Sequence, residues 1–184
     1  AEASSPISAS SSPFLPLELN NERLIYVDSF SKTLSITGWR IGYIITEKSI
    51  MESLKNIHDF TGLCAPSILQ KAITRYLKKY NFGEEYSRDL RDKLKHSFTL
   101  FTRKLKTTPL QIPAILGGYF LWAELPESCS DGFSFAQDLF EKIKVAVVPG
   151  ENFSLHKKNY IRLNFAQKPE IIEEAGERIA GFGF

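Results

Sequence analysis

The chain has 184 residues, 43% of them hydrophobic, so it can bury a core of one domain or one and a half. The formal net charge is +2, which favours neither a nucleic-acid-binding surface nor a polybasic membrane anchor. No apolar run approaches the roughly 18 residues of a membrane span, and no signal-peptide pattern begins the chain. Cys64 and Cys129 fit no metal-ligand spacing, so we expect reduced thiols, no metal site and a cytoplasmic protein. For Cys64, a buried thiol is the simplest expectation.

Residues 1–20 are rich in Ser and Pro and show no helical or strand period, so we expect an irregular segment. Two short runs of strand-forming residues follow, at 24–27 and 41–46. Apolar residues at helical spacing then predict three helices, over 50–57, 68–80 and 86–105. The last of these is long enough to span two domains, and prolines beyond it break the pattern.

The rest of the chain alternates strands and helices. The expected elements are, in order, a strand over 117–125, a helix over 134–143, strands over 145–148 and 160–166, and a helix beginning at Pro169. The strand at 145–148 reads as buried, and the one at 117–125 is entered through two glycines. This order predicts an α/β or α+β fold, in which helices cover a sheet.

Lys32 lies in a polar loop between the first two predicted strands. Ser29 and Ser31 supply hydroxyl donors, and Arg40 supplies a planar charged group suited to a phosphate. An amine that is crowded by positive charge and partly desolvated has a lowered pKa and becomes a nucleophile toward an aldehyde. These residues would suit pyridoxal phosphate, which is a phosphate-bearing aldehyde. Spacing alone leaves open a plain loop, with Lys32 in solvent and Arg40 paired to a carboxylate.

The segment SFSKTLSITGWRIGY resembles the cofactor-lysine segment of class I/II aminotransferases, the fold-type I pyridoxal phosphate-dependent enzymes. The family pattern of Ser-x-Ser/Ala-Lys followed by Gly-x-Arg-x-Gly is matched by Ser29, Ser31, Lys32, Gly38, Arg40 and Gly42. Three further motifs, GGYFLW, VVPGENF and YIRLNFA, stand in the family's order. The resemblance implies the α/β aminotransferase fold, of which this chain would be a C-terminal part.

The resemblance also implies a division into domains. Residues 21–85 would be the C-terminal part of the large cofactor-binding domain, with the end of its sheet and the lysine loop. Residues 86–184 would be the small C-terminal α+β domain, and the long amphipathic helix would link the two.

Carried over by residue, Lys32 resembles the lysine that forms a Schiff base with the cofactor. Ser29, Ser31 and Arg40 resemble the ligands of its phosphate. The implied reaction moves an amino group between an amino acid and a 2-oxo acid, with Lys32 as general base and then general acid. Members of the family are usually homodimers, so we expect a homodimer for the complete protein and neither nucleic acid nor membrane as a partner.

Arg162 resembles the arginine that binds the substrate α-carboxylate. The strand pattern supports this independently, because Ile161, Leu163 and Phe165 alternate onto one face and leave Arg162 on the other. A guanidinium in a cleft is matched bidentately by a carboxylate. A surface arginine on an edge strand is the alternative. Phe153, in the PGENF motif, is expected in a loop beside the substrate or in a simple tight turn.

The sequence departs from the family pattern in one respect. The family's aspartate on the pyridine nitrogen precedes the lysine by roughly thirty residues, whereas the first aspartate here is Asp28. We therefore expect the isolated 184 residues to be inactive alone. Two alternatives stay open: a pyridoxal phosphate-dependent lyase or synthase of the same fold, and a non-catalytic, aminotransferase-like interaction module.

Overall fold

The computed structural model describes residues 23–129 and 131–184. The Ser- and Pro-rich segment predicted at 1–20 lies outside the described residues. Within them the chain forms two compact units, 23–90 and 91–184, and one helix is continuous across the boundary.

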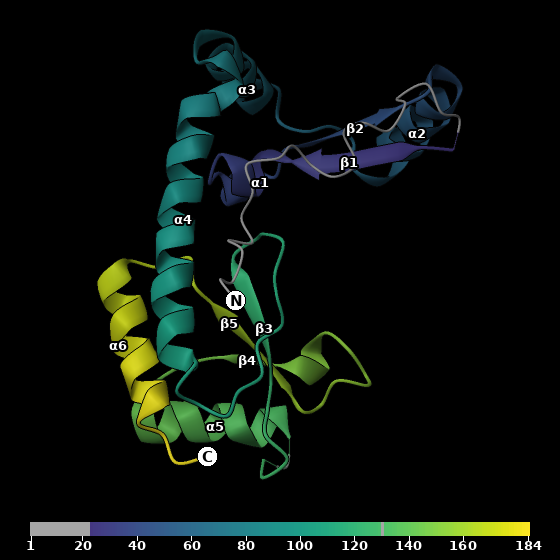
Figure 1. The fold of residues 1–184 in the computed structure, drawn as a ribbon. Helices are drawn as coiled ribbons and strands as arrows, with labels where there is room; N and C mark the ends of the chain where they lie inside the picture. Colours follow the sequence, from purple (N-terminus) through teal and green to yellow (C-terminus); the bar gives the residue numbers. More distant parts are fainter. Residues whose placement is uncertain (1–22, 130) are drawn as a thin grey trace. The chain divides into compact units, whose positions relative to one another are not determined.

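The first unit consists of a two-stranded sheet followed by helices (Figure 1). Its elements are β1 (Ile25–Ser29), α1 (Phe30–Thr33), η1 (Thr37–Trp39), β2 (Gly42–Thr46), α2 (Lys48–Thr61), α3 (Ser67–Lys79), η2 (Asn81–Gly83) and the start of α4 (Glu84–Leu105). The strands are antiparallel, and Ser29 lies opposite Gly42. The two strands and three helices expected here are confirmed, and α4 is the long helix predicted at 86–105.

The unit 23–90 buries little apolar surface. Among its described residues, the apolar side chains that are buried are Ile41 and Ile73. Apolar side chains on both strands are exposed, and Val27 is 68% exposed. Phe60, near the end of α2, is 93% exposed. Because hydrophobic burial is the main favourable term in folding, this unit holds few of the contacts that could stabilise it alone.

The second unit is a three-stranded antiparallel sheet with helices. Its elements are the rest of α4, β3 (Phe120–Glu124), α5 (Gly132–Ile143), β4 (Val148–Pro149), η3 (Gly150–Asn152), β5 (Tyr160–Asn164) and α6 (Pro169–Ala180). The strand order is β3-β5-β4, so β5 is central. Asp131 caps α5, since its carboxylate accepts a hydrogen bond from the Ser134 N–H at 2.8 Å. Pro169 opens α6, as the sequence predicts.

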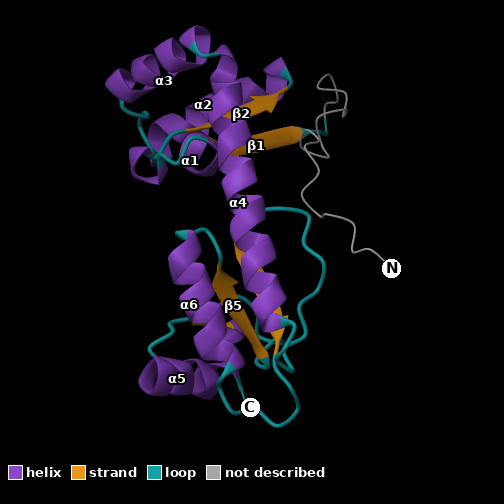
Figure 2. Cartoon of the chain, turned by 60° about the vertical axis from the view of Figure 1, so that its left-hand side comes forward, coloured by secondary structure: helices purple, strands orange, loops and turns teal. Residues whose placement is uncertain are grey.

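The core of the second unit lies on one face of this sheet. In Figures 1 and 2, α4 and α6 run side by side, and Gly176 of α6 allows the close contact with Lys104 of α4. The core is made of side chains from all three helices and from β3 and β5, chiefly Phe101, Leu105, Leu121, Leu139, Ile161, Leu163, Phe165, Ile172 and Ile179. The alternation predicted for Ile161, Leu163 and Phe165 is therefore confirmed.

Three expectations about local structure are corrected. Strand β3 begins at Phe120 rather than at residue 117, because Gly118 has a φ of +94°, outside the extended region. Strand β4 contains Pro149 and is shorter than expected, since the Val145 N–H donates to Leu139 O at the end of α5 instead of to a strand. Cys64, for which a buried thiol is the simplest expectation, is exposed.

Candidate functional site

The lysine loop is closed by the sheet of the first unit. Beyond the Ser29–Gly42 pair, the Phe30 N–H donates to Ile41 O at 3.2 Å. This bond draws the start of the loop against its end, where Arg40 lies. Lys32 sits in the single turn α1 that follows. The fold thus places Ser29, Lys32 and Arg40 in one short closed loop.

Inside this loop, Ser31 is buried and takes part in a hydrogen bond that stabilises the loop. Its carbonyl accepts a hydrogen bond from the Thr37 hydroxyl at 3.1 Å. Arg40 has a left-handed backbone with φ of +53°, a conformation that costs a residue other than glycine about 1–2 kcal/mol. Its Nη1 donates to Thr37 O at 3.3 Å. In the part of the chain that the structure describes, Arg40 makes no ion pair, so the carboxylate partner of the plain-loop interpretation is not found.

The side-chain hydroxyls of Ser29 and Ser31 make no hydrogen bond to any residue in 23–129 or 131–184. Hydroxyl donors and a guanidinium in one loop form a donor set that suits a phosphate. The residues present therefore fit the phosphate group that the sequence assigns to them.

Next to this loop lies a hydrogen-bonded group that the sequence analysis missed. The Asp28 carboxylate accepts hydrogen bonds from the hydroxyls of Tyr26 and Tyr43, each at 3.1 Å, and from the Ser29 N–H at 2.6 Å. Burial and the Asp28 carboxylate raise the pKa of the Tyr43 phenol. The alternation of Tyr26 and Asp28 on β1, with Tyr43 on β2, was the available signal. This group fixes the backbone immediately before the loop.

A pocket of about 440 Å³ adjoins the Asp28 group. It is lined by Asp28, Phe30, Thr33, Leu34, Tyr43, Leu77, Phe82 and Ser87. Lys32 and Arg40 are not among these residues, so this pocket is not the predicted phosphate site.

In the second unit, Arg162 lies on the face of the sheet opposite the core. Its strand is central rather than at an edge, so the alternative of an edge-strand arginine is wrong. The guanidinium carbon is 4.2 Å from the ring centre of Phe120 and 4.1 Å from that of Phe153. The Nε atom is buried and has no hydrogen-bond partner. Within the described residues Arg162 makes no ion pair either.

An unpaired, buried, charged donor is expensive, at about 1–3 kcal/mol or more. Such groups are rare in native proteins, and each calls for an explanation. The guanidinium also has no anionic partner among the described residues, and a ligand carboxylate would supply one at its Nη atoms. The residues around Arg162 therefore fit a carboxylate, and Phe120, which the sequence analysis did not single out, belongs to the same site.

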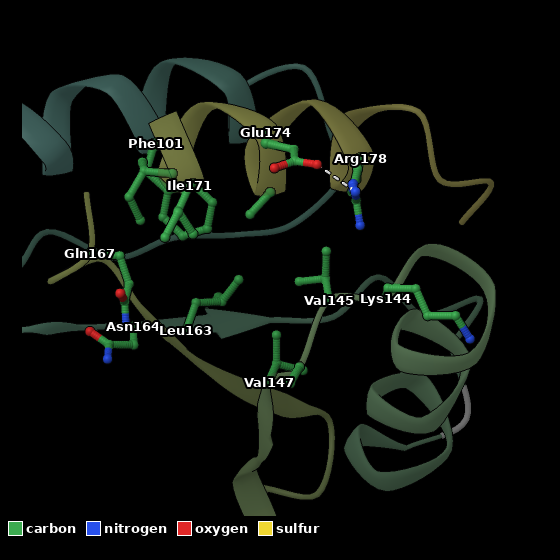
Figure 3. Close-up of a pocket in the computed structure, with 13 residues that line it drawn as sticks. Phe101, Lys144, Val145, Val147, Leu163, Asn164, Gln167, Ile171, Glu174 and Arg178 are labelled. Atoms are coloured by element: carbon green, nitrogen blue, oxygen red, sulfur yellow. Dashed lines mark hydrogen bonds and ion pairs between the residues drawn. The ribbon is translucent and has the colours of Figure 1, made fainter. Parts of the chain in front are cut away.

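The second unit has a pocket of about 450 Å³ on the core side of β5 (Figure 3). Its lining is mostly apolar, and Leu163 contributes from β5. The cations at its rim already have partners: Arg178 donates to Ile143 O and to the Glu174 carboxylate, and Lys144 donates to Glu141 O. The Arg178–Ile143 bond holds the end of α5 to α6, so we assign this pocket to the fold rather than to the candidate site.

No helix in 23–129 or 131–184 is long and apolar enough to cross a membrane. The same residues contain no group of three or more His, Cys, Asp or Glu side chains placed to hold a metal ion.

Comparison with known proteins identifies the family. The model of the family "Aminotransferase class I and II" matches residues 4–179. A (5-formylfuran-3-yl)methyl phosphate transaminase from Methanocaldococcus jannaschii is 32% identical over 166 residues, which cover 89% of this chain and 43% of that protein. A probable N-acetyl-LL-diaminopimelate aminotransferase from Bacillus subtilis is 29% identical over 88% of this chain and 40% of its own length.

Solved structures agree with the sequence matches. The aspartate aminotransferase of Thermotoga maritima superposes with a TM-score of 0.81 at 28% identity, over 96% of this chain and 44% of that one. The chain belongs to the class I and II aminotransferase family. The predicted fold class, a mixed α/β arrangement of the aminotransferase type, is confirmed. The chain spans less than half the length of the relatives it matches.

Proposed function

We propose that the protein containing this chain is a pyridoxal phosphate-dependent aminotransferase, which moves an amino group between an amino acid and a 2-oxo acid. The family match and the names of the relatives support this reaction type. The observation that carries the proposal is the closed loop that contains Ser29, Lys32 and Arg40. Among the described residues, the Ser29 hydroxyl makes no hydrogen bond and the Arg40 guanidinium makes no ion pair that would compete with a phosphate.

Four residues would hold the cofactor. The Lys32 Nζ would bond to its aldehyde carbon, and the hydroxyls of Ser29 and Ser31 and the Arg40 guanidinium would bind its phosphate. When bound, pyridoxal phosphate supplies an electron-withdrawing ring that stabilises negative charge at the substrate Cα. The domain division proposed from the resemblance assigns these residues to the large domain and Arg162 to the small one.

The chain's own residues would then act on the substrate. The Arg162 guanidinium would donate two hydrogen bonds to the α-carboxylate and so orient the Cα–H bond. The Lys32 amine would remove the Cα proton as a general base and then donate it as a general acid. A 2-oxo acid would be bound through the same carboxylate contact. The homodimer and the cytoplasmic location stay predictions.

The test measures amino-group exchange by the protein that contains this chain. With pyridoxal phosphate, an amino acid labelled with ¹⁵N should transfer its label to a 2-oxo acid, and Lys32→Ala should abolish the transfer. Lys55→Ala, at an exposed position of α2, is the matched control and should retain it. Release of ammonia and an oxo acid without exchange would indicate a lyase. Equal activity of the Lys32→Ala variant, or no cofactor binding, would overturn the proposal.

A further inference from the structure

Two aromatic rings contact the Arg162 guanidinium. Its Cζ atom lies 4.2 Å from the ring centre of Phe120 and 4.1 Å from the ring centre of Phe153. Cation–π attraction is strongest when the cation is desolvated, and a planar guanidinium stacks on aromatic rings better than an ammonium does. Two rings therefore restrict both the position of the guanidinium and the water that can reach its faces.

The two rings come from different parts of the unit. Phe120 begins β3 and lies opposite Asn164, whereas Trp122, two residues on, lies opposite Arg162. Side chains two apart on a strand share a face, so Phe120, Trp122 and Arg162 stand on the same side of the sheet. Phe153 comes from the turn after η3. The pair is thus made by tertiary structure and not by neighbours in sequence.

Phe153 is itself held in place by other contacts. Its ring meets Trp122 edge to face at 5.8 Å, and Trp122 stacks on Tyr160 at 5.5 Å. The Phe153 N–H donates to Gly150 O at 2.9 Å. Gly150 is buried against Lys157 O and Tyr160, so a side chain at position 150 would displace this turn. The ring over Arg162 therefore has a fixed support.

With two rings against the guanidinium and Nε buried, the Nη atoms are where a ligand can hydrogen-bond. We propose that Phe120 and Phe153 are positioning residues, which hold Arg162 with one edge presented to the substrate carboxylate. This inference rests on the proposed function, because it takes Arg162 as the carboxylate-binding residue. It adds that affinity for both substrates depends on two aromatic rings that contact the arginine.

The proposal predicts a specific kinetic pattern. Phe153→Leu keeps an apolar side chain but removes one ring, and Phe120→Leu does the same for the other ring. Each change should raise KM for the amino acid and for the 2-oxo acid by about three- to thirty-fold, which is the range of one cation–π contact. Because the carboxylate is bound in both ground and transition states, kcat should change much less. Phe153→Tyr retains a ring and should restore KM.

The controls separate failure of this inference from failure of the proposed function. The experiment uses the protein that contains this chain, with Arg162→Met alone and combined with Phe153→Leu. Arg162→Met should raise KM for both substrates, and Phe153→Leu should then add nothing, because its effect acts through the arginine. Phe133→Leu, at a position 57% exposed on α5, should leave KM unchanged.

The outcomes distinguish the two claims. If Arg162→Met leaves KM unchanged, the carboxylate assignment in the proposed function is wrong. If Arg162→Met raises KM but neither Phe→Leu change does, the role of the rings is wrong and the proposed function stands. A rise in KM that persists in the Arg162→Met background, or that Phe153→Tyr fails to reverse, would also refute the positioning role.

Discussion

The distribution of buried side chains predicts that residues 91–184 fold without the rest of the chain. Of the 16 buried hydrophobic residues among the described positions, all but Ile41 and Ile73 lie in this unit. Expressed alone, the segment should unfold cooperatively in urea, followed by circular dichroism. Residues 23–90 alone should show no such transition, because their apolar side chains are mostly exposed.

Leu121→Ala measures this core directly. Leu121 is fully buried in the middle of β3, so removal of its side chain should lower the free energy of unfolding by about 2–5 kcal/mol. For a domain of this size, a loss of about 3 kcal/mol corresponds to a fall in Tm of roughly 10–25 °C. The slope of the free energy against urea concentration should stay the same, since the native surface hardly changes.

Leu155→Ala is the matched control, because it is the same chemical change at a side chain that is 85% exposed. It should alter the free energy of unfolding by no more than about 0.5 kcal/mol. Equal effects of the two substitutions would contradict the placement of the core on this face of the sheet. A non-cooperative transition of the unsubstituted segment would show that the core depends on residues outside 91–184.

Three further outcomes follow from single groups. In the 184-residue chain, a thiol reagent should modify Cys64 quickly and Cys129 slowly, because Cys64 is exposed while burial raises the pKa of the Cys129 thiol. Cys64→Ser should remove the fast phase of the reaction. A fast phase that remains in this variant would refute the assignment of that phase to Cys64. Burial and Asp28 raise the pKa of Tyr43, so the neutral phenol stabilises the fold fully below pH 10, and this contribution is lost as pH rises above that value. Above pH 10, the free energy of unfolding of Tyr43→Phe should therefore increase relative to that of the unsubstituted chain. A difference that stays constant with pH would contradict this prediction. Asp131→Ala removes the cap of α5 and should cost about 1 kcal/mol in chemical unfolding of the second unit, whereas no loss would show that the Ser134 N–H has another acceptor.

Much of the fold was predictable because its signals are local. The spacing of apolar residues placed α3, α4 and α6, and the alternation around Arg162 placed that side chain on the face away from the core. The errors arose where a backbone or pairing choice is not local. Strand β4 is short because Val145 bonds to the end of α5, and no pattern within residues 145–148 encodes that partner.

The charged residues of the candidate site, and Phe153, could be proposed from the sequence, whereas Phe120 could not. Lys32, Arg40 and Arg162 stand in short motifs, and charge at a fixed spacing is visible in a sequence. The two ring contacts of Arg162 join residues that are far apart in sequence: the pairing of β3 with β5 brings Phe120 to the arginine, and the turn after η3 brings Phe153. Aromatic residues occur in every core, so their meeting with an arginine becomes apparent from coordinates.

The central claim, that Lys32 binds pyridoxal phosphate, is tested most directly by identifying the residue to which the cofactor is attached. The protein that contains these residues is incubated with pyridoxal phosphate, reduced with borohydride and digested, and its peptides are analysed by mass spectrometry. We expect a pyridoxyl-phosphate modification on the peptide that carries Lys32. This modification should disappear when an amino acid substrate is added before the reduction. Modification at another lysine, with Lys32 unmodified under saturating cofactor, would contradict it.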